Sequence, residues 1–140
     1  MGQNKAKILI VDDEEEIRNS LSRHFEFDGY EIETASNGVK ALEILEKKRV
    51  EVVITDIMMP EMNGVELLKQ IRNDYPMTHA IVITGYVTME NLLAALRYGA
   101  DTCIFKPLED MAELDDSVKK AVEDLKKWQQ KLKELKGMKV

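Results

Sequence analysis

The chain has 140 residues, a formal net charge of −6 and 33% charged residues; this size and composition predict one folded domain and exclude a disordered tail. No apolar run approaches the ~18 residues that a membrane span needs. The single cysteine, Cys103, excludes an intrachain disulfide and a cysteine-clustered zinc site. We therefore expect a cytoplasmic protein that makes no contact with a membrane.

The charges are divided unevenly along the chain. Residues 1–116 hold 12 basic and 23 acidic residues, a net charge of −11, whereas residues 117–140 hold 8 lysines and 3 acids, a net charge of +5. An acidic body repels nucleic acid. Because the basic end contains no recognition-helix unit, we expect no direct nucleic-acid binding.

Hydrophobic periodicity predicts five short strands. The runs at 7–11, 51–55 and 80–84 are β-branched and continuously apolar, which is typical of strands buried on both faces of a parallel sheet. Residues 30–35 alternate apolar and charged side chains, which indicates an edge strand, and a fifth apolar run covers 102–105.

Helical periods separate these strands. Apolar residues recur at helical spacing over 17–25, 41–45, 65–71 and 92–96. Strict alternation of strand and helix predicts right-handed crossovers and a doubly wound α/β fold of the flavodoxin-like type. We expect a five-stranded parallel sheet of order 2-1-3-4-5, flanked by five helices, with ligands bound at the carboxyl ends of its strands.

Polar residues end four of the predicted strands. Asp12 and Asp13 follow the first, Asp56 the third, Thr84 ends the fourth, and Lys106 follows the fifth. Each has an ordinary explanation by itself, as a helix cap, a turn former or a solvated loop charge. Capping does not explain three acids on adjacent strands together with a lysine. We therefore expect these side chains to meet at one edge of the sheet.

Three converging carboxylates need a positive partner. Oxygen ligands of this kind suit a hard divalent cation, most naturally Mg²⁺. When the ion neutralises two carboxylates, the third is able to attack phosphorus. Lys106 and Thr84 would then contact the equatorial phosphoryl oxygens, and Gly85 would leave room for the phosphodonor. The pattern predicts phosphoryl transfer to an aspartate.

Four stretches resemble the receiver domains of two-component response regulators. They are residues 8–13, 56–64, 83–85 and 105–107, within a match over roughly 5–120. The resemblance implies a chemotaxis-regulator-like fold, with residues 1–120 forming the receiver domain. It implies that Asp56 accepts a phosphoryl group from the phosphohistidine of a histidine kinase or phosphotransfer protein. The chain would then be a signalling switch and not a dedicated enzyme, promoting at most its own phosphorylation and dephosphorylation.

The resemblance also assigns metal ligands. Asp13 and Asp56 would bind Mg²⁺ directly, with the Met58 backbone carbonyl as the third protein ligand. Asp12 would act chiefly through a metal-bound water. Family members usually have a cis peptide before the proline that matches Pro107, and X-Pro makes that conformation inexpensive.

Four residues are implied in switching: Thr84, Gly85, Tyr86 and Cys103. Phosphorylation would shift the face of the fourth helix, fifth strand and fifth helix, and so control a partner or output domain. The family generally has an aromatic residue three positions before the lysine, where this chain has Cys103. Tyr86 either replaces part of that aromatic role, or gates water, or is a half-exposed loop residue. Cys103 is expected to be a small apolar residue rather than a redox sensor.

Three other functions fit the residues less well. A phosphohydrolase with an aspartyl-phosphate would need Asp-x-Asp-x-Thr/Val after the first strand, where this chain has five consecutive acids, 12–16. The same acids would repel the phosphate of a flavin. A non-phosphorylated scaffold would not need every group of the acidic site. His24 and His79 lack metal-ligand spacing, so we assign neither of them a function.

The end of the chain repeats apolar residues in steps of three and four. They are Val118, Ala121, Leu125, Trp128, Leu132 and Leu135. This 3.5-residue period is typical of a coiled-coil seam. A single helix over 110–136 would measure ~40 Å, more than the sheet covers. Residues 121–140 are therefore predicted to extend the last helix. In one alternative this extension is a coiled coil or linker that forms a homodimer or transmits a signal. In the other it is the end of a terminal helix whose second half frays.

Overall fold

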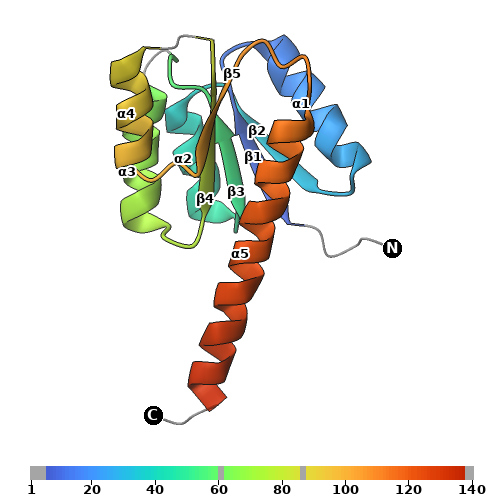
Figure 1. The fold of residues 1–140 in the computed structure, drawn as a ribbon, viewed down its shortest axis with the longest axis vertical. Helices are drawn as coiled ribbons and strands as arrows, with labels where there is room; N and C mark the ends of the chain where they lie inside the picture. Colours follow the sequence, from blue (N-terminus) through green and yellow to red (C-terminus); the bar gives the residue numbers. More distant parts are fainter. Residues whose placement is uncertain (1–5, 60–61, 86–87, 138–140) are drawn as a thin grey trace.

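The computed structural model describes residues 6–59, 62–85 and 88–137, in which strands and helices alternate along the chain (Figure 1). The elements are β1 (Lys7–Val11), α1 (Glu15–Phe27), β2 (Glu31–Ala35), α2 (Gly38–Lys47), β3 (Val52–Thr55), α3 (Gly64–Asp74), β4 (His79–Thr84), α4 (Met89–Arg97), β5 (Thr102–Phe105) and α5 (Ala112–Gly137). No helix within these residues combines the length and apolarity needed to cross a membrane.

The five strands form one parallel sheet in the order β2-β1-β3-β4-β5, which confirms the predicted topology. In register, Val11 of β1 lies between Ala35 of β2 and Thr55 of β3, so the first and third strands end side by side. Loops at this carboxyl edge therefore bring the residues after β1 and β3 together. β2 lies at one edge of the sheet, as its alternating pattern predicted.

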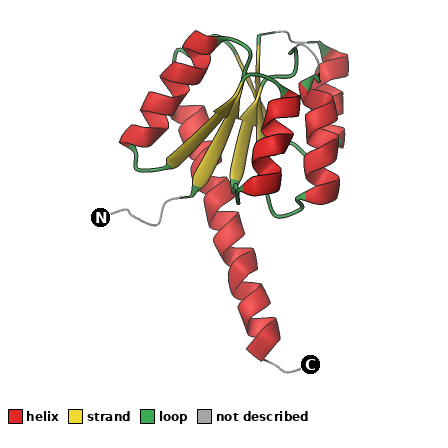
Figure 2. Ribbon diagram, turned by 180° about the vertical axis from the view of Figure 1, so that it is seen from behind, coloured by secondary structure: helices red, strands yellow, loops and turns green. Residues whose placement is uncertain are grey.

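Helices cover both faces of the sheet (Figures 1 and 2). Ile8 and Ile10 face α1 and α5, where they pack against buried residues such as Phe25 and Leu114. Leu9, by contrast, faces α2 and α3. All of these β1 side chains have no exposed surface, because successive residues of a central strand point to opposite covered faces. Each contributes about 1.5–3 kcal/mol by burial.

Side-chain caps fix where three of the helices begin. The side-chain oxygens of Asn37, Asn63 and Thr88 accept hydrogen bonds from backbone N–H groups in the first turns of α2, α3 and α4, at 2.9–3.0 Å. Gly99, two residues after the end of α4, has a φ of 86°, and this left-handed conformation ends the helix.

α5 is one continuous helix of 26 residues. Leu114, Val118 and Ala121 are buried against the sheet, on the face shared with α1, and Leu125 is the next buried residue of α5. Beyond them the helix projects past the sheet, and Trp128, Leu132 and Leu135 are 58%, 49% and 54% exposed (Figure 1). The second half of the apolar seam is therefore uncovered within the described chain.

A histidine–carboxylate pair joins β4 to the start of β5. His79 Nδ1 lies 2.6 Å from Asp101 Oδ2. The hydrogen bond to Asp101 raises the pKa of His79, burial opposes this shift, and the charges of Asp101 and Asp124 add to it. A pKa raised above the unfolded value of 6.5 stabilises the fold below that pH, and the contribution is lost as pH rises through the folded-state pKa.

We therefore expect Asp101→Asn to lower the free energy of unfolding by about 0.5–1 kcal/mol at about pH 6 and by much less at about pH 9. Urea denaturation at the two pH values measures the difference. Asp74→Asn, which changes an exposed carboxylate at the end of α3, is the control and should show no such dependence on pH. Equal losses from Asp101→Asn at both pH values would contradict the assignment.

Candidate functional site

The polar residues predicted at the ends of four strands meet at the carboxyl edge of the sheet. Backbone hydrogen bonds hold the ends in place: Asp12 N–H donates to Ala35 O at 3.2 Å, Asp56 N–H to Val11 O at 3.0 Å, and Lys106 N–H to Thr84 O at 2.9 Å. Each bond continues the strand pairing by one residue, and the side chains of Asp12, Asp56 and Lys106 meet in a common pocket.

Lys106 is the centre of this pocket. Its Nζ lies 2.8 Å from Asp56 Oδ2, 2.9 Å from Asp12 Oδ2 and 3.2 Å from Glu14 Oε1. Burial lowers the pKa of Lys106, but hydrogen bonds and charge from Asp56 and Asp12 outweigh burial and raise it above its ordinary value. The ammonium therefore stays protonated and offsets the carboxylates around it.

Asp56 is held by both of its carboxylate oxygens. Oδ1 accepts hydrogen bonds from the backbone N–H groups of Ile57 at 2.6 Å and Met58 at 3.3 Å, while Oδ2 contacts Lys106. The side chain is 8% exposed. Three donors thus fix the orientation of the carboxylate at the floor of the pocket.

Asp12 is fully buried. Its Oδ1 accepts a hydrogen bond from Glu14 N–H at 2.9 Å, and the Arg18 guanidinium donates to its backbone carbonyl at 2.7 Å. Burial raises the pKa of Asp12, the bonds to Glu14 and Lys106 oppose this, and the charge of Asp56 adds to it. Asp12 therefore places a buried carboxylate beside both Lys106 and Asp56.

The residues present fit a hard divalent ion. One carboxylate oxygen from each of Asp12, Asp13, Glu14 and Asp56 lies within 4.8 Å of the others. Two of these residues are buried and two are exposed, so the group opens to solvent on one side. An all-oxygen set of this kind suits Mg²⁺. The Met58 carbonyl remains a predicted ligand.

Gly64 packs directly against the backbone of Asp56. A Cβ built on Gly64 would lie 2.2 Å from the Asp56 carbonyl oxygen and 2.8 Å from Ile57 Cα, which no side-chain motion relieves. A Cβ on Gly85 would lie 3.6 Å from Lys106 Cβ, an ordinary contact. Only at Gly64 does the structure require the absence of a side chain to keep the aspartate loop in place.

The predicted switch residues are only partly described. Thr84 is buried at the end of β4, next to Gly85. Cys103 is half-buried in β5 and packs against the cluster beneath α4, and burial together with the charges of Asp56 and Glu113 raises the pKa of its thiol. A raised thiol pKa agrees with an unreactive apolar role. Tyr86 lies outside the described residues. The Lys106–Pro107 peptide is cis, as expected.

Three residues that shape the pocket were not predicted from the sequence. Glu14 reaches Lys106, Arg18 supports Asp12, and Gly64 admits the Asp56 backbone. Glu14 lay in the acidic run and could have been suspected from its place beside Asp13. Arg18 follows Asp12 by six residues on α1, and no sequence pattern marked it.

Comparison with known proteins assigns this arrangement to a family. The family model described as "Response regulator receiver domain" matches residues 8–119. The chain belongs to this family. Receiver domains of response regulators are signalling switches and bind Mg²⁺ at an acidic pocket such as this one.

Named relatives agree with the assignment. The regulatory protein AtoC of Escherichia coli is 40% identical over 117 residues, 84% of this chain and 25% of AtoC, so the receiver chain spans about a quarter of that relative. A CheY-like receiver domain from Methanospirillum hungatei is 34% identical, with a TM-score of 0.84 over 89% of this chain and 98% of that one. TrrA from Thermotoga maritima, solved in complex with Mg(2+)-BeF, is 35% identical, with a TM-score of 0.75 over 83% of this chain and 98% of TrrA.

Proposed function

We propose that this receiver domain accepts a phosphoryl group on Asp56 and thereby switches the state of a partner or output domain. The observation that carries the proposal is the fixed carboxylate of Asp56, with one oxygen bound by two backbone N–H groups and the other facing the Lys106 ammonium. An oriented nucleophile beside a fixed positive charge is what phosphoryl transfer asks of a protein.

In the proposed step, a carboxylate oxygen of Asp56 attacks the phosphorus of a phosphohistidine. The new O–P bond forms while the N–P bond breaks, and its electron pair returns to the imidazole nitrogen of the donor. The Lys106 ammonium would then contact a phosphoryl oxygen instead of the free carboxylate. The Thr84 hydroxyl would donate a hydrogen bond to a second phosphoryl oxygen. Hydrolysis of the acyl phosphate by water would return Asp56 to its free state.

Asp13, Asp56 and the Met58 carbonyl would hold Mg²⁺, with Asp12 supporting it. The bound ion would supply charge compensation for the carboxylates and the incoming phosphoryl group. The grouping of four carboxylates within 4.8 Å of one another supports this role.

The partner surface is proposed to include α4, β5 and α5. Leu93, Leu96 and Phe105 lie there with 48%, 60% and 49% of their surface exposed. Phe105 pairs with Thr84 in the sheet and directly precedes Lys106, so it would respond when those residues move toward a phosphoryl group. The proposed donor is a histidine kinase or a phosphotransfer protein.

The test is intact-protein mass after incubation with Mg²⁺ and acetyl phosphate. We expect the mass of one phosphoryl group to be added, with peptide mapping placing it on Asp56. Asp56→Asn should remove the adduct, and Asp74→Asn should retain it. An adduct that persists in Asp56→Asn would overturn the proposal. Repeated turnover of phosphate esters would instead support a phosphohydrolase.

We further propose that residues 121–140 extend the receiver and join two copies through the seam of Trp128, Leu132 and Leu135. These side chains are exposed and repeat at coiled-coil spacing. We expect sedimentation at micromolar concentration to show a dimer, at least with a phosphate analogue, and Leu132→Asp to shift it to monomer. Lys133→Asp, on an adjacent face of the helix, is the control. A monomer under both conditions would exclude the dimer.

A further inference from the structure

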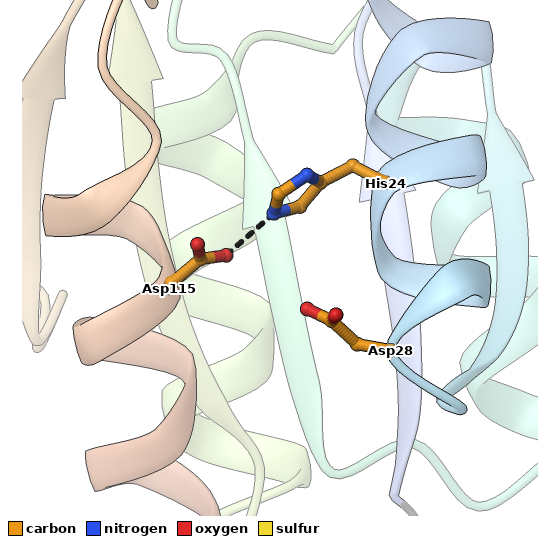
Figure 3. A group of neighbouring side chains, drawn as sticks. All are labelled: His24, Asp28 and Asp115. Atoms are coloured by element: carbon orange, nitrogen blue, oxygen red, sulfur yellow. Dashed lines mark hydrogen bonds and ion pairs between the residues drawn. The ribbon is translucent and has the colours of Figure 1, made fainter.

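A second group of metal-binding side chains lies between α1 and α5, away from the acidic pocket. His24 near the end of α1, Asp28 directly after it, and Asp115 in the first turn of α5 each offer a ligand atom, and these atoms lie within 4.8 Å of one another. Figure 3 shows His24 and Asp28 extending from the α1 side into the space between the two helices, where Asp115 meets the imidazole from α5. His24 Nε2 lies 2.6 Å from Asp115 Oδ1.

The spacing of His24 and Asp28 places them on one face of α1. Residues four apart are neighbours on a helix, and Asp28 keeps right-handed helical dihedrals, with φ −78° and ψ −3°. The ring of His24 is held edge-on against Phe25, with the centroids 4.8 Å apart and the planes at 87°. Its Nε2 therefore faces the carboxylates in a fixed orientation.

Helix stability does not account for Asp28. A negative charge at the carboxyl end of a helix opposes the helix dipole. Within residues 6–59, 62–85 and 88–137, Asp28 forms no ion pair, and Asp115 pairs only with His24. Two carboxylates and one imidazole thus meet here, and no lysine or arginine of the described residues forms a salt bridge with either carboxylate.

We propose that His24, Asp28 and Asp115 form a second metal site, which takes a transition-metal ion such as Zn²⁺. Imidazole nitrogen suits zinc and its neighbours in the first transition series, whereas the all-oxygen pocket around Asp56 suits Mg²⁺. Three protein ligands leave a fourth position for water. The bound ion would join the last turn of α1 to the first turn of α5.

The side chains are able to reach the required geometry. Ligand atoms of a tetrahedral zinc site lie about 3.3 Å apart. The present separations run from 2.6 Å to at most 4.8 Å, and Asp28 is exposed while His24 and Asp115 are half-buried, so side-chain rotation is sufficient. His24 lacks metal-ligand spacing in the sequence because one of its partners, Asp115, lies 91 residues away and approaches it only in the folded chain.

Asp28→Asn is the decisive variant, because Asp28 makes no side-chain hydrogen bond or ion pair within the described residues that its loss would break. Zn²⁺ binding is measured by calorimetry in excess Mg²⁺, which occupies the acidic pocket. We expect one Zn²⁺ per wild-type chain, and binding weaker by about 10-fold or more in Asp28→Asn and His24→Gln. Zn²⁺ should also raise the unfolding temperature of the wild type and of neither variant.

His79→Gln is the matched control. His79 has the same 2.6 Å contact to a carboxylate, Asp101, but no third ligand within reach in the described chain. It should bind Zn²⁺ as the wild type does. If Asp28→Asn also binds Zn²⁺ with unchanged affinity, or if the wild type takes up none in excess Mg²⁺, the proposed site is wrong. Neither result would bear on phosphorylation of Asp56.

Discussion

Gly64→Ala is expected to lower the free energy of unfolding by about 3 kcal/mol or more, at the upper end of overpacking effects. The added Cβ would lie 2.2 Å from the Asp56 carbonyl oxygen, so the contact is with backbone and no rotamer change removes it. Either α3 or the Asp56 loop must move. Urea denaturation measures the loss, and the displaced carboxylate should also accept a phosphoryl group more slowly than the wild type.

Gly38→Ala provides a matched comparison. Gly38 and Gly64 both begin a helix directly after a capping asparagine, Asn37 or Asn63. At Gly38 the nearest atoms belong to the Met62 side chain, at 2.8–3.0 Å, and this side chain is able to move aside. Because alanine favours helix by about 1 kcal/mol over glycine, we expect a change of no more than about 1 kcal/mol. Similar losses at both positions would contradict the argument from backbone contact.

Lys106→Met is expected to have the second large effect. The substitution keeps much of the apolar stem but removes the ammonium that contacts Asp12, Glu14 and Asp56. The carboxylates left behind repel each other in a site that is largely buried. We expect a loss of about 3 kcal/mol at neutral pH without Mg²⁺, and phosphoryl acceptance from acetyl phosphate slower by about 100-fold.

The dependence on pH and Mg²⁺ distinguishes electrostatics from packing in this variant. The raised pKa of Lys106 keeps its contribution present throughout the range below its unfolded pKa of 10.5. In Lys106→Met the deficit should shrink as pH falls and Asp12, whose pKa burial raises, takes up a proton. Mg²⁺ should stabilise the variant more than the wild type. A loss of unfolding free energy that depends on neither pH nor Mg²⁺ would indicate lost packing alone.

Lys48→Met is the control for removing a lysine charge. Lys48 Nζ lies 2.7 Å from Glu33 Oε2, as close as Lys106 lies to Asp56, but its side chain is 47% exposed. An exposed pair of this kind contributes about 1 kcal/mol or less. A loss near that of Lys106→Met would show that burial of the pocket is not the cause.

The fold and the core of the site followed from local patterns. Ile8–Val11 is continuously apolar because β1 is covered on both faces, and that pattern alone placed it inside the sheet. Asp56 and Lys106 could be brought together from sequence because parallel strands end at a common edge, whatever the details of packing.

Other features depended on how elements lie against one another. The contact of His24 with Asp115 spans 91 residues and exists because α1 and α5 cover the same face of the sheet. The approach of Gly64 to the Asp56 carbonyl depends on where α3 begins relative to β3. Neither contact follows from hydrophobic periodicity or motif spacing, so neither could be predicted from the sequence.

The continuous α5 helix has a mechanical consequence. It begins at the edge of the sheet that carries Asp56 and runs past the opposite edge (Figure 1). After Leu125, its last buried residue, the helix continues to Gly137, about 18 Å at 1.5 Å per residue. Any small tilt where α5 contacts the sheet becomes a larger sideways displacement at its far end. α5 would therefore act as a lever arm that carries motion from one end of the molecule to the other.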